Sequence, residues 1–103
     1  MEIIYSHSKI TDFIESMDVS LVSDVQTVID RLEALGHELK MPYSKSLGKG
    51  LFELRITGSI QIRIIYAFHS NHAVLLNIFT KKTWAIPRKE LEYARNILKL
   101  YLA

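Results

Sequence analysis

One glutamate and two arginines, Glu53, Arg55 and Arg63, interrupt a strongly apolar stretch of this 103-residue chain, LFELRITGSIQIRIIYAF over residues 51–68. Planar guanidinium groups carry donors whose spacing suits the oxygens of a phosphate, so a pair of them could form an anion cradle. The glutamate could instead neutralise an arginine in a weak ion pair on an exposed sheet face. The alignment of the strands bears on this choice.

The alternation of side chains along a strand predicts that alignment. A three-residue loop over 58–60 places Leu54 opposite Ile64 and Arg55 opposite Arg63, which gathers the apolar side chains on one face. Two like charges directly opposite each other on a sheet are unfavourable. Either the neighbouring glutamate or an external anion must therefore offset the two arginines.

Further cations are expected near this pair. Lys81, Lys82 and Thr83 follow the last predicted strand, and a central strand would deliver them to the rim of the same sheet. Lys45 and Lys49 lie in the segment that leads into the first strand of the hairpin. Five or six cations could converge there, which favours the anion cradle.

Aromatic residues could add contacts to nucleic-acid bases. Tyr43, Trp84 and Tyr66 are the candidates, and stacking on one base contributes roughly 1 to 3 kcal/mol. For Trp84, packing of the last helix onto the sheet is an equal alternative.

The charges of the chain are divided along its length. Residues 1–40 hold eight acidic and three basic residues, whereas residues 41–103 hold ten basic and three acidic residues. This polarity indicates an anionic partner for the later part of the chain, with nucleic acid the commonest candidate.

The composition excludes several classes of protein. The chain has no cysteine, so it has neither a disulfide framework nor a thiolate metal site. His69 and His72 flank a turn without a nearby carboxylate, which favours an exposed hairpin over a metal site. No stretch approaches a membrane span and the first residues do not resemble a leader, so we expect one cytoplasmic domain over residues 1–103 with no membrane contact.

The periodicity of apolar residues predicts the elements that position these groups. A short strand over 2–5 precedes two helices, the first beginning at Ser6 or Ser8 and running to about Met17. Asp18 or Ser20 restarts the chain, and the apolar positions of the second helix recur from Val22 to a stop at Gly36. Residues 37–50 are predicted to form a loop. Strands follow at 51–57, 60–68 and 73–79, and a helix over 86–102 closes the chain.

The order β-α-α-β-β-β-α defines an α+β fold in which a small, mainly antiparallel sheet packs on helices through one face. The other face is then expected to be partly open, and the arginine pair would lie on it.

Four sequence elements in this order resemble the RelE/ParE superfamily of bacterial toxins, most closely its phage-derived Gp49-like, HigB-type branch. The first element is Pro42, Lys45 and Leu47, and the second is Leu51, Glu53, Leu54 and Arg55. The third and fourth are Arg63 with Tyr66, and Phe79, Lys81, Lys82 and Thr83. The resemblance covers about residues 40 to 100.

This resemblance implies a RelE-like fold and a toxin that cleaves mRNA, usually in the ribosomal A site, without a metal or cofactor. It also implies a cognate antitoxin with a helix-turn-helix domain, through which alone the toxin reaches operator DNA. Arg63 matches the superfamily's phosphate-binding arginine, and Arg55 and Lys82 are the next catalytic candidates. Lys45, Lys49, Lys81, Thr83, Tyr66 and Trp84 would contact the RNA.

The acid and base are not specified by this resemblance, because the segment TWAIP lacks the tyrosine that RelE members carry there. Glu53 could act as the base and a lysine as the acid. Two other functions stay open: a ParE-like inhibitor of DNA gyrase that acts by binding, and a degenerate toxin that retains only antitoxin binding.

Overall fold

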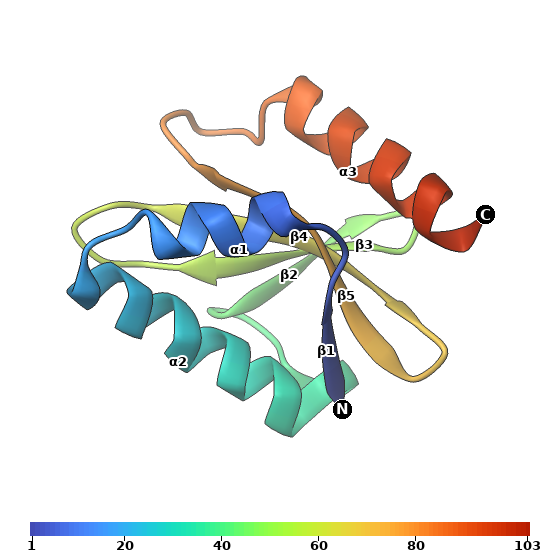
Figure 1. The fold of residues 1–103 in the computed structure, drawn as a ribbon, viewed down its shortest axis with the longest axis horizontal. Helices are drawn as coiled ribbons and strands as arrows, with labels where there is room; N and C mark the ends of the chain where they lie inside the picture. Colours follow the sequence, from blue (N-terminus) through green and yellow to red (C-terminus); the bar gives the residue numbers. More distant parts are fainter.

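The computed structural model describes all residues, 1–103, and has the α+β architecture expected from the sequence (Figure 1). Its elements in chain order are β1 (Glu2–Tyr5), α1 (Ser8–Glu15), α2 (Val19–Leu35), the 3-10 turn η1 (Gly36–Glu38), β2 (Ser44–Gly48), β3 (Leu51–Ile56), β4 (Ile62–His69), β5 (His72–Thr80) and α3 (Arg88–Leu102). The strands form one sheet in the order β1-β5-β4-β3-β2. Only β1 and β5 run parallel, and all other neighbours are antiparallel.

The register between β3 and β4 confirms the alignment predicted from the alternation of apolar residues. Leu54 lies opposite Ile64, and Arg55 lies opposite Arg63. The predicted three-residue loop over 58–60 is too short, because β3 ends at Ile56 and β4 begins at Ile62, so residues 57–61 form the connection. This register places the two arginines side by side on neighbouring strands.

The loop predicted over residues 37–50 is wrong in its second half, where residues 44–48 form the edge strand β2. Its sequence, SKSLG, is polar and short, and a bulge between Ser46 and Gly48 interrupts its pairing with β3. Short polar strands with bulges are typical of sheet edges because they discourage pairing with other chains. The same features hide such a strand from a search for apolar periodicity.

The helix α2 begins and ends at residues with identifiable roles. α2 begins at Val19, directly after Asp18, one of the two residues predicted to restart the chain, and Asp18 caps it by accepting a hydrogen bond from the Leu21 amide at 3.3 Å. Gly36 ends α2 with φ +54°, a conformation that glycine adopts without steric cost.

The helices cover both faces of the sheet, not one. α1 and α2 pack on the first face around a core cluster of 14 buried residues, including Ile10, Leu32, Leu54 and Ile64. α3 packs on the opposite face around a cluster of seven, to which it contributes Ala94 (Figure 1). None of the three helices has the length and apolar composition needed to cross a membrane.

The expectation that the second face is partly open is therefore wrong at the charged positions. Glu53 and Arg63 are only 2 % and 4 % exposed on the face that α3 covers. The reason is that the closing helix returns over this face, which strand periodicity cannot indicate.

Candidate functional site

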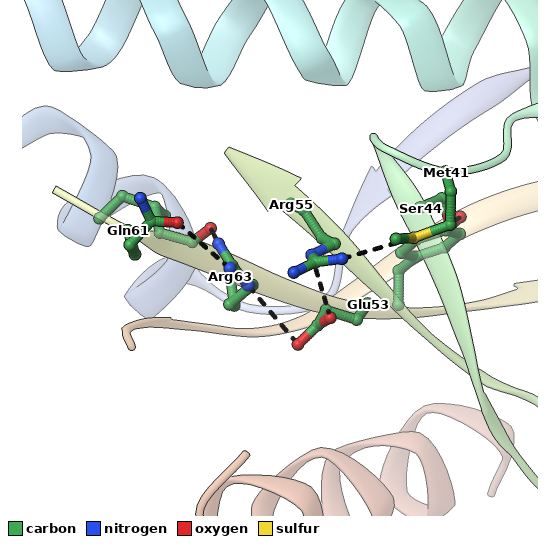
Figure 2. A network of polar contacts seen from close by, with 8 residues as sticks. Met41, Ser44, Glu53, Arg55, Gln61 and Arg63 are labelled. Carbon is green, nitrogen blue, oxygen red and sulfur yellow. Dashed lines mark hydrogen bonds and ion pairs between the residues drawn. The ribbon is translucent and has the colours of Figure 1, made fainter. Parts of the chain in front are cut away.

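A carboxylate and two guanidinium groups meet at the ends of β3 and β4 (Figure 2). Glu53 Oε1 lies 3.6 Å from Arg55 Nε, and Glu53 Oε2 lies 3.6 Å from Arg63 Nε. The repulsion between the opposed arginines is thus offset from within the chain. The carboxylate holds both guanidinium groups on the same side of the sheet.

Arg63 is fixed by its own strand as well as by the carboxylate. Its Nη1 donates to the Ile62 carbonyl at 2.9 Å, and its Nη2 donates to Gln61 Oε1 at 3.2 Å. Arg63 Nε and Glu53 Oε2 have no hydrogen-bond partner, although both atoms are buried. Burial lowers the pKa of the Arg63 guanidinium, the negative charge of Glu53 raises it, and the positive charge of Arg55 lowers it further.

Arg55 is more accessible than Arg63, with 26 % of its side chain exposed. Its Nη1 donates to the Met41 sulfur at 3.4 Å, beyond the edge of the sheet (Figure 2). This reach is possible because β2 begins at Ser44, opposite Leu54, so the end of β3 has no neighbouring strand on that side. Arg55 can therefore contact ligands at the sheet edge as well as on the α3 side.

Both arginines open onto a depression of about 420 Å³, here called the basic depression. It is lined by Arg55, Gln61, Arg63, Lys81, Lys82, Thr83 and Trp84. The Lys81 amide donates to the Gln61 carbonyl at 2.8 Å, which joins the segment after β5 to the loop before β4. The predicted delivery of residues 81–83 to the rim beside the arginine pair is thus observed.

Gln61 is the residue of this depression that the sequence reasoning did not select. Its signal was available, because it shares a face with Arg63 by the alternation of strand residues. The amide oxygen of Gln61 orients the Arg63 guanidinium. A neutral side chain beside an arginine does not stand out until its contact is known.

Glu53 does not line the basic depression, although it was a candidate base. Its side chain is 3 % exposed and lies between the two arginines. No carboxylate and no imidazole is among the residues that line the depression. This geometry suits Glu53 to positioning the guanidinium groups and not to accepting a proton from a bound substrate.

Lys45 and Lys49 do not line the basic depression. Lys45 is exposed on the edge strand opposite Glu53, and Lys49 lies in the turn before Leu51, at the other end of β3 from Arg55. Four residues of strand, about 13 Å, separate the Cα atoms of Leu51 and Arg55. The sequence placed these lysines in a loop whose path it could not specify. The formation of β2 places Lys45 opposite Glu53 and leaves Lys49 at the far end of β3.

The three aromatic candidates lie in different environments. Tyr66 is 1 % exposed in the core cluster on the α1 and α2 face, where its hydroxyl and that of Ser44 are 2.5 Å apart. The ring of Tyr66 is therefore not accessible for stacking on a nucleic-acid base. Trp84 is 100 % exposed at the rim of the basic depression and does not pack the last helix onto the sheet. Tyr43 is half-buried at the edge beyond β2.

The turn between β4 and β5 has the conformation of an exposed hairpin. Ser70 and Asn71 both have positive φ, as in a two-residue turn that joins antiparallel strands. His72 Nε2 lies 3.0 Å from Glu2 Oε1, and His69 packs edge-on against Tyr101. The hairpin is as the sequence favoured, but the expectation of no nearby carboxylate is wrong, because β1 pairs with β5 and brings Glu2 beside His72.

The chain matches the family model described as phage derived protein Gp49-like (DUF891) over residues 12–99. No curated protein matches it. Because the match spans most of the chain, the protein belongs to this family. The Gp49-like family is a phage-derived, toxin-like family within the RelE-like group.

Proposed function

We propose that the chain is the toxin of a type II toxin-antitoxin system, in the HigB-type branch of its superfamily, and that it cleaves mRNA on translating ribosomes in the cytoplasm. The observation that carries the proposal is the basic depression itself. Two guanidinium groups and two ammonium groups line one open surface, and an exposed indole stands at its rim. Family membership supports the toxin assignment.

The proposed reaction needs no metal. The ribose 2′-oxygen attacks the adjacent phosphorus, a new bond forms between these atoms, and the bond from phosphorus to the 5′-oxygen breaks. The products are a 2′,3′-cyclic phosphate and a free 5′-hydroxyl. Negative charge builds on the non-bridging oxygens at the pentavalent stage, where cations already in place give the largest stabilisation.

Each cation of the basic depression takes a role that its position allows. Arg63, held by Gln61 and the Ile62 carbonyl, stabilises the pentavalent phosphorane, and Arg55 shares this task from the neighbouring strand. Lys82 is exposed at the rim and protonates the leaving 5′-oxygen. Lys81 and Thr83 hold the RNA backbone, and Trp84 stacks on a base.

The proton of the attacking 2′-hydroxyl passes to water in this scheme, because the groups that line the depression include no carboxylate or imidazole. Glu53 acts one step away from the substrate by holding Arg55 and Arg63 together. Catalysis then depends mainly on fixed positive charge.

The partners in this proposal are mRNA and an antitoxin with a helix-turn-helix domain. The antitoxin silences the toxin, and operator DNA is bound only through it. Lys45 and Lys49, which do not line the basic depression, would contact other parts of the RNA backbone.

The test compares the 5′ ends of cellular mRNA, and growth, after brief induction of the wild-type protein and of Arg63→Ala. New ends within translated codons are expected for the wild type and not for the variant. Lys82→Ala changes an exposed residue and is less prone to misfold, so it serves as the second variant. Arg88→Ala removes an exposed cation outside the depression and should cleave normally. Growth arrest with DNA damage and without new ends would replace the proposal with gyrase inhibition.

A further inference from the structure

A second depression adjoins the basic depression on the side of α2. It has a volume of about 420 Å³, within the range of small-molecule sites, and we call it the α2 cleft. Its polar lining consists of Asp24, Thr27, Arg31, Tyr43, Arg55 and Thr57. Arg55 is the residue that the two depressions share. A ligand in one depression therefore lies beside a ligand in the other.

The guanidinium group of Arg31 is positioned in this cleft to bind an anion. Its guanidinium carbon lies 4.4 Å from the centroid of the Tyr43 ring, so the ring supports the planar cation by stacking. Arg31 makes no ion pair with any carboxylate of the chain. The N–H donors along the edge of its guanidinium thus stay available, and they suit the oxygens of a phosphate.

Asp24 adds a hydrogen-bond acceptor to the cleft, beside the cationic Arg31. It lies on α2, two turns before Arg31, and its Oδ2 lies against Gly58 of the β3–β4 connection. A carboxylate accepts hydrogen bonds and repels phosphates and other carboxylates. Together with the hydroxyls of Thr27 and Thr57, it suits the N–H donors on the edge of a nucleic-acid base.

We propose that the α2 cleft is the subsite for the nucleotide next to the scissile phosphate of single-stranded RNA. Arg31, supported by Tyr43, holds the flanking phosphate, and Asp24 accepts hydrogen bonds from the base. Guanine presents adjacent N–H donors on its Watson–Crick edge, so it is the preferred base. Arg55 connects this subsite to the basic depression. The inference rests on the proposed RNA-cleaving function and names the residues that select the substrate.

An acidic peptide segment, such as a part of a protein partner, is the competing occupant. Two arginines in the α2 cleft would attract it, but the carboxylate of Asp24 would oppose it. The continuity with the basic depression through Arg55 also favours an extended strand of RNA. The experiment below includes this occupant as an outcome.

The test measures binding separately from cleavage. A short, fluorescently labelled oligoribonucleotide with 2′-O-methyl riboses cannot be cut by the proposed reaction, and its anisotropy reports its affinity for the full chain. Arg31→Gln should weaken binding roughly tenfold, as expected for the loss of one charge-assisted contact. Both residues favour a helix, so the variant should fold normally.

Arg88→Gln is the matched control, because it removes the same charge from an exposed helix outside both depressions. It should change affinity far less than Arg31→Gln does. Tyr43→Leu should reproduce part of the Arg31 effect, since it removes the ring that supports the guanidinium. Equal losses in Arg31→Gln and Arg88→Gln would show general attraction only and would overturn the subsite.

The base preference supplies a readout that charge alone would not move. The wild type should bind a guanine-containing oligonucleotide more tightly than one of uracil, and Asp24→Asn should lose this preference. An unchanged preference, no binding by the wild type, or binding of a glutamate-rich peptide in place of the RNA would each overturn the proposal. New mRNA ends in cells that depend on Arg63 would still support cleavage in those cases, so the two failures are distinguishable.

Discussion

The two faces of the sheet bury different kinds of residue. The face under α1 and α2 carries a cluster of 14 buried apolar residues that extends over three of the five strands, β3, β4 and β5. The face under α3 carries only seven, and its buried set continues into Glu53 and Arg63 near the ends of β3 and β4. One face can therefore supply most of the stability, while the other holds charges at a cost that the first face offsets.

Because of this difference between the faces, residues that are neighbours in sequence have separate roles. Glu53 and Leu54 follow one another on β3, yet one holds the arginine pair and the other packs in the large core cluster. Substitutions on β3 can therefore test whether stability and activity are divided between the faces as proposed.

The largest effect on stability is expected for Glu53→Gln. Removing one partner of a buried ion pair leaves the other charge uncompensated, so the free energy of unfolding should fall by about 3–5 kcal/mol. Chemical denaturation measures this loss. Cleavage should weaken at every pH, with the shape of the pH profile retained, because the carboxylate positions the arginines. A profile that loses its acidic limb would show that Glu53 is the base after all.

A matched pair of core substitutions compares the two faces directly. Leu54 and Leu51 are both buried on β3, but they belong to the larger and the smaller cluster respectively. Each change to alanine should cost about 2–5 kcal/mol, with Leu54→Ala toward the upper end and Leu51→Ala toward the lower end. Denaturant midpoints of the two variants decide this. Equal costs would contradict the unequal division of stability between the faces.

Arg63→Ala should reduce the rate of mRNA cleavage by roughly 10²- to 10³-fold, as expected for the loss of a group that stabilises charge in the transition state. Purified protein added to translating ribosomes gives the rate. Leu54→Ala, assayed at a temperature where it stays folded, should cleave at a nearly normal rate. Similar losses in both variants would mean that activity follows stability and not the charged end of the α3 face.

Tyr66→Phe removes the hydroxyl that lies 2.5 Å from Ser44 Oγ in the larger core cluster. The free energy of unfolding should fall by about 1–3 kcal/mol at neutral pH, because Ser44 is left buried without this partner. Activity per folded molecule should not change, since Tyr66 lies away from the basic depression. A selective loss of RNA binding in this variant would show instead that Tyr66 contacts the RNA.

The same variant should also change how the free energy of unfolding depends on pH in alkaline solution. Burial raises the pKa of Tyr66 above its ordinary value of 10.0, and the Ser44 hydrogen bond partly opposes this shift. The unfolded chain thus ionises first, so this contribution is present below about pH 10 and is lost as the pH rises through the folded-state pKa. Tyr66→Phe should show a shallower loss of stability above pH 10. Burial also raises the pKa of Tyr5, which therefore retains part of the slope.

The smallest effect on stability is expected for Trp84→Ala, because this side chain is fully exposed. The denaturation midpoint should stay the same, whereas affinity for a single-stranded oligoribonucleotide should fall roughly tenfold through the loss of one stacked base. Trp84→Phe should retain most of the affinity. A lower midpoint with unchanged affinity would assign Trp84 a packing role.

The sequence by itself determined the faces and the register of the central hairpin. Alternation along residues 51–68 favoured Leu54 opposite Ile64 and Arg55 opposite Arg63, because a shift by one residue mixes apolar and charged side chains. It also determined the existence of the three helices, the central strands and the lysines at the end of β5. These features follow from local periodicity, which the order of residues contains directly.

Only the tertiary structure decided how deeply the charged groups are buried and which of them meet. The return of α3 over the second face buried Glu53 and Arg63, and the formation of the polar strand β2 left Lys49 at the far end of β3. The packing of α2 beside the end of β3 brought Arg31 and Asp24 to the cleft that Arg55 shares. The burial of these side chains and their convergence depend on which distant element covers a surface. Residue periodicity within one strand or helix does not indicate this.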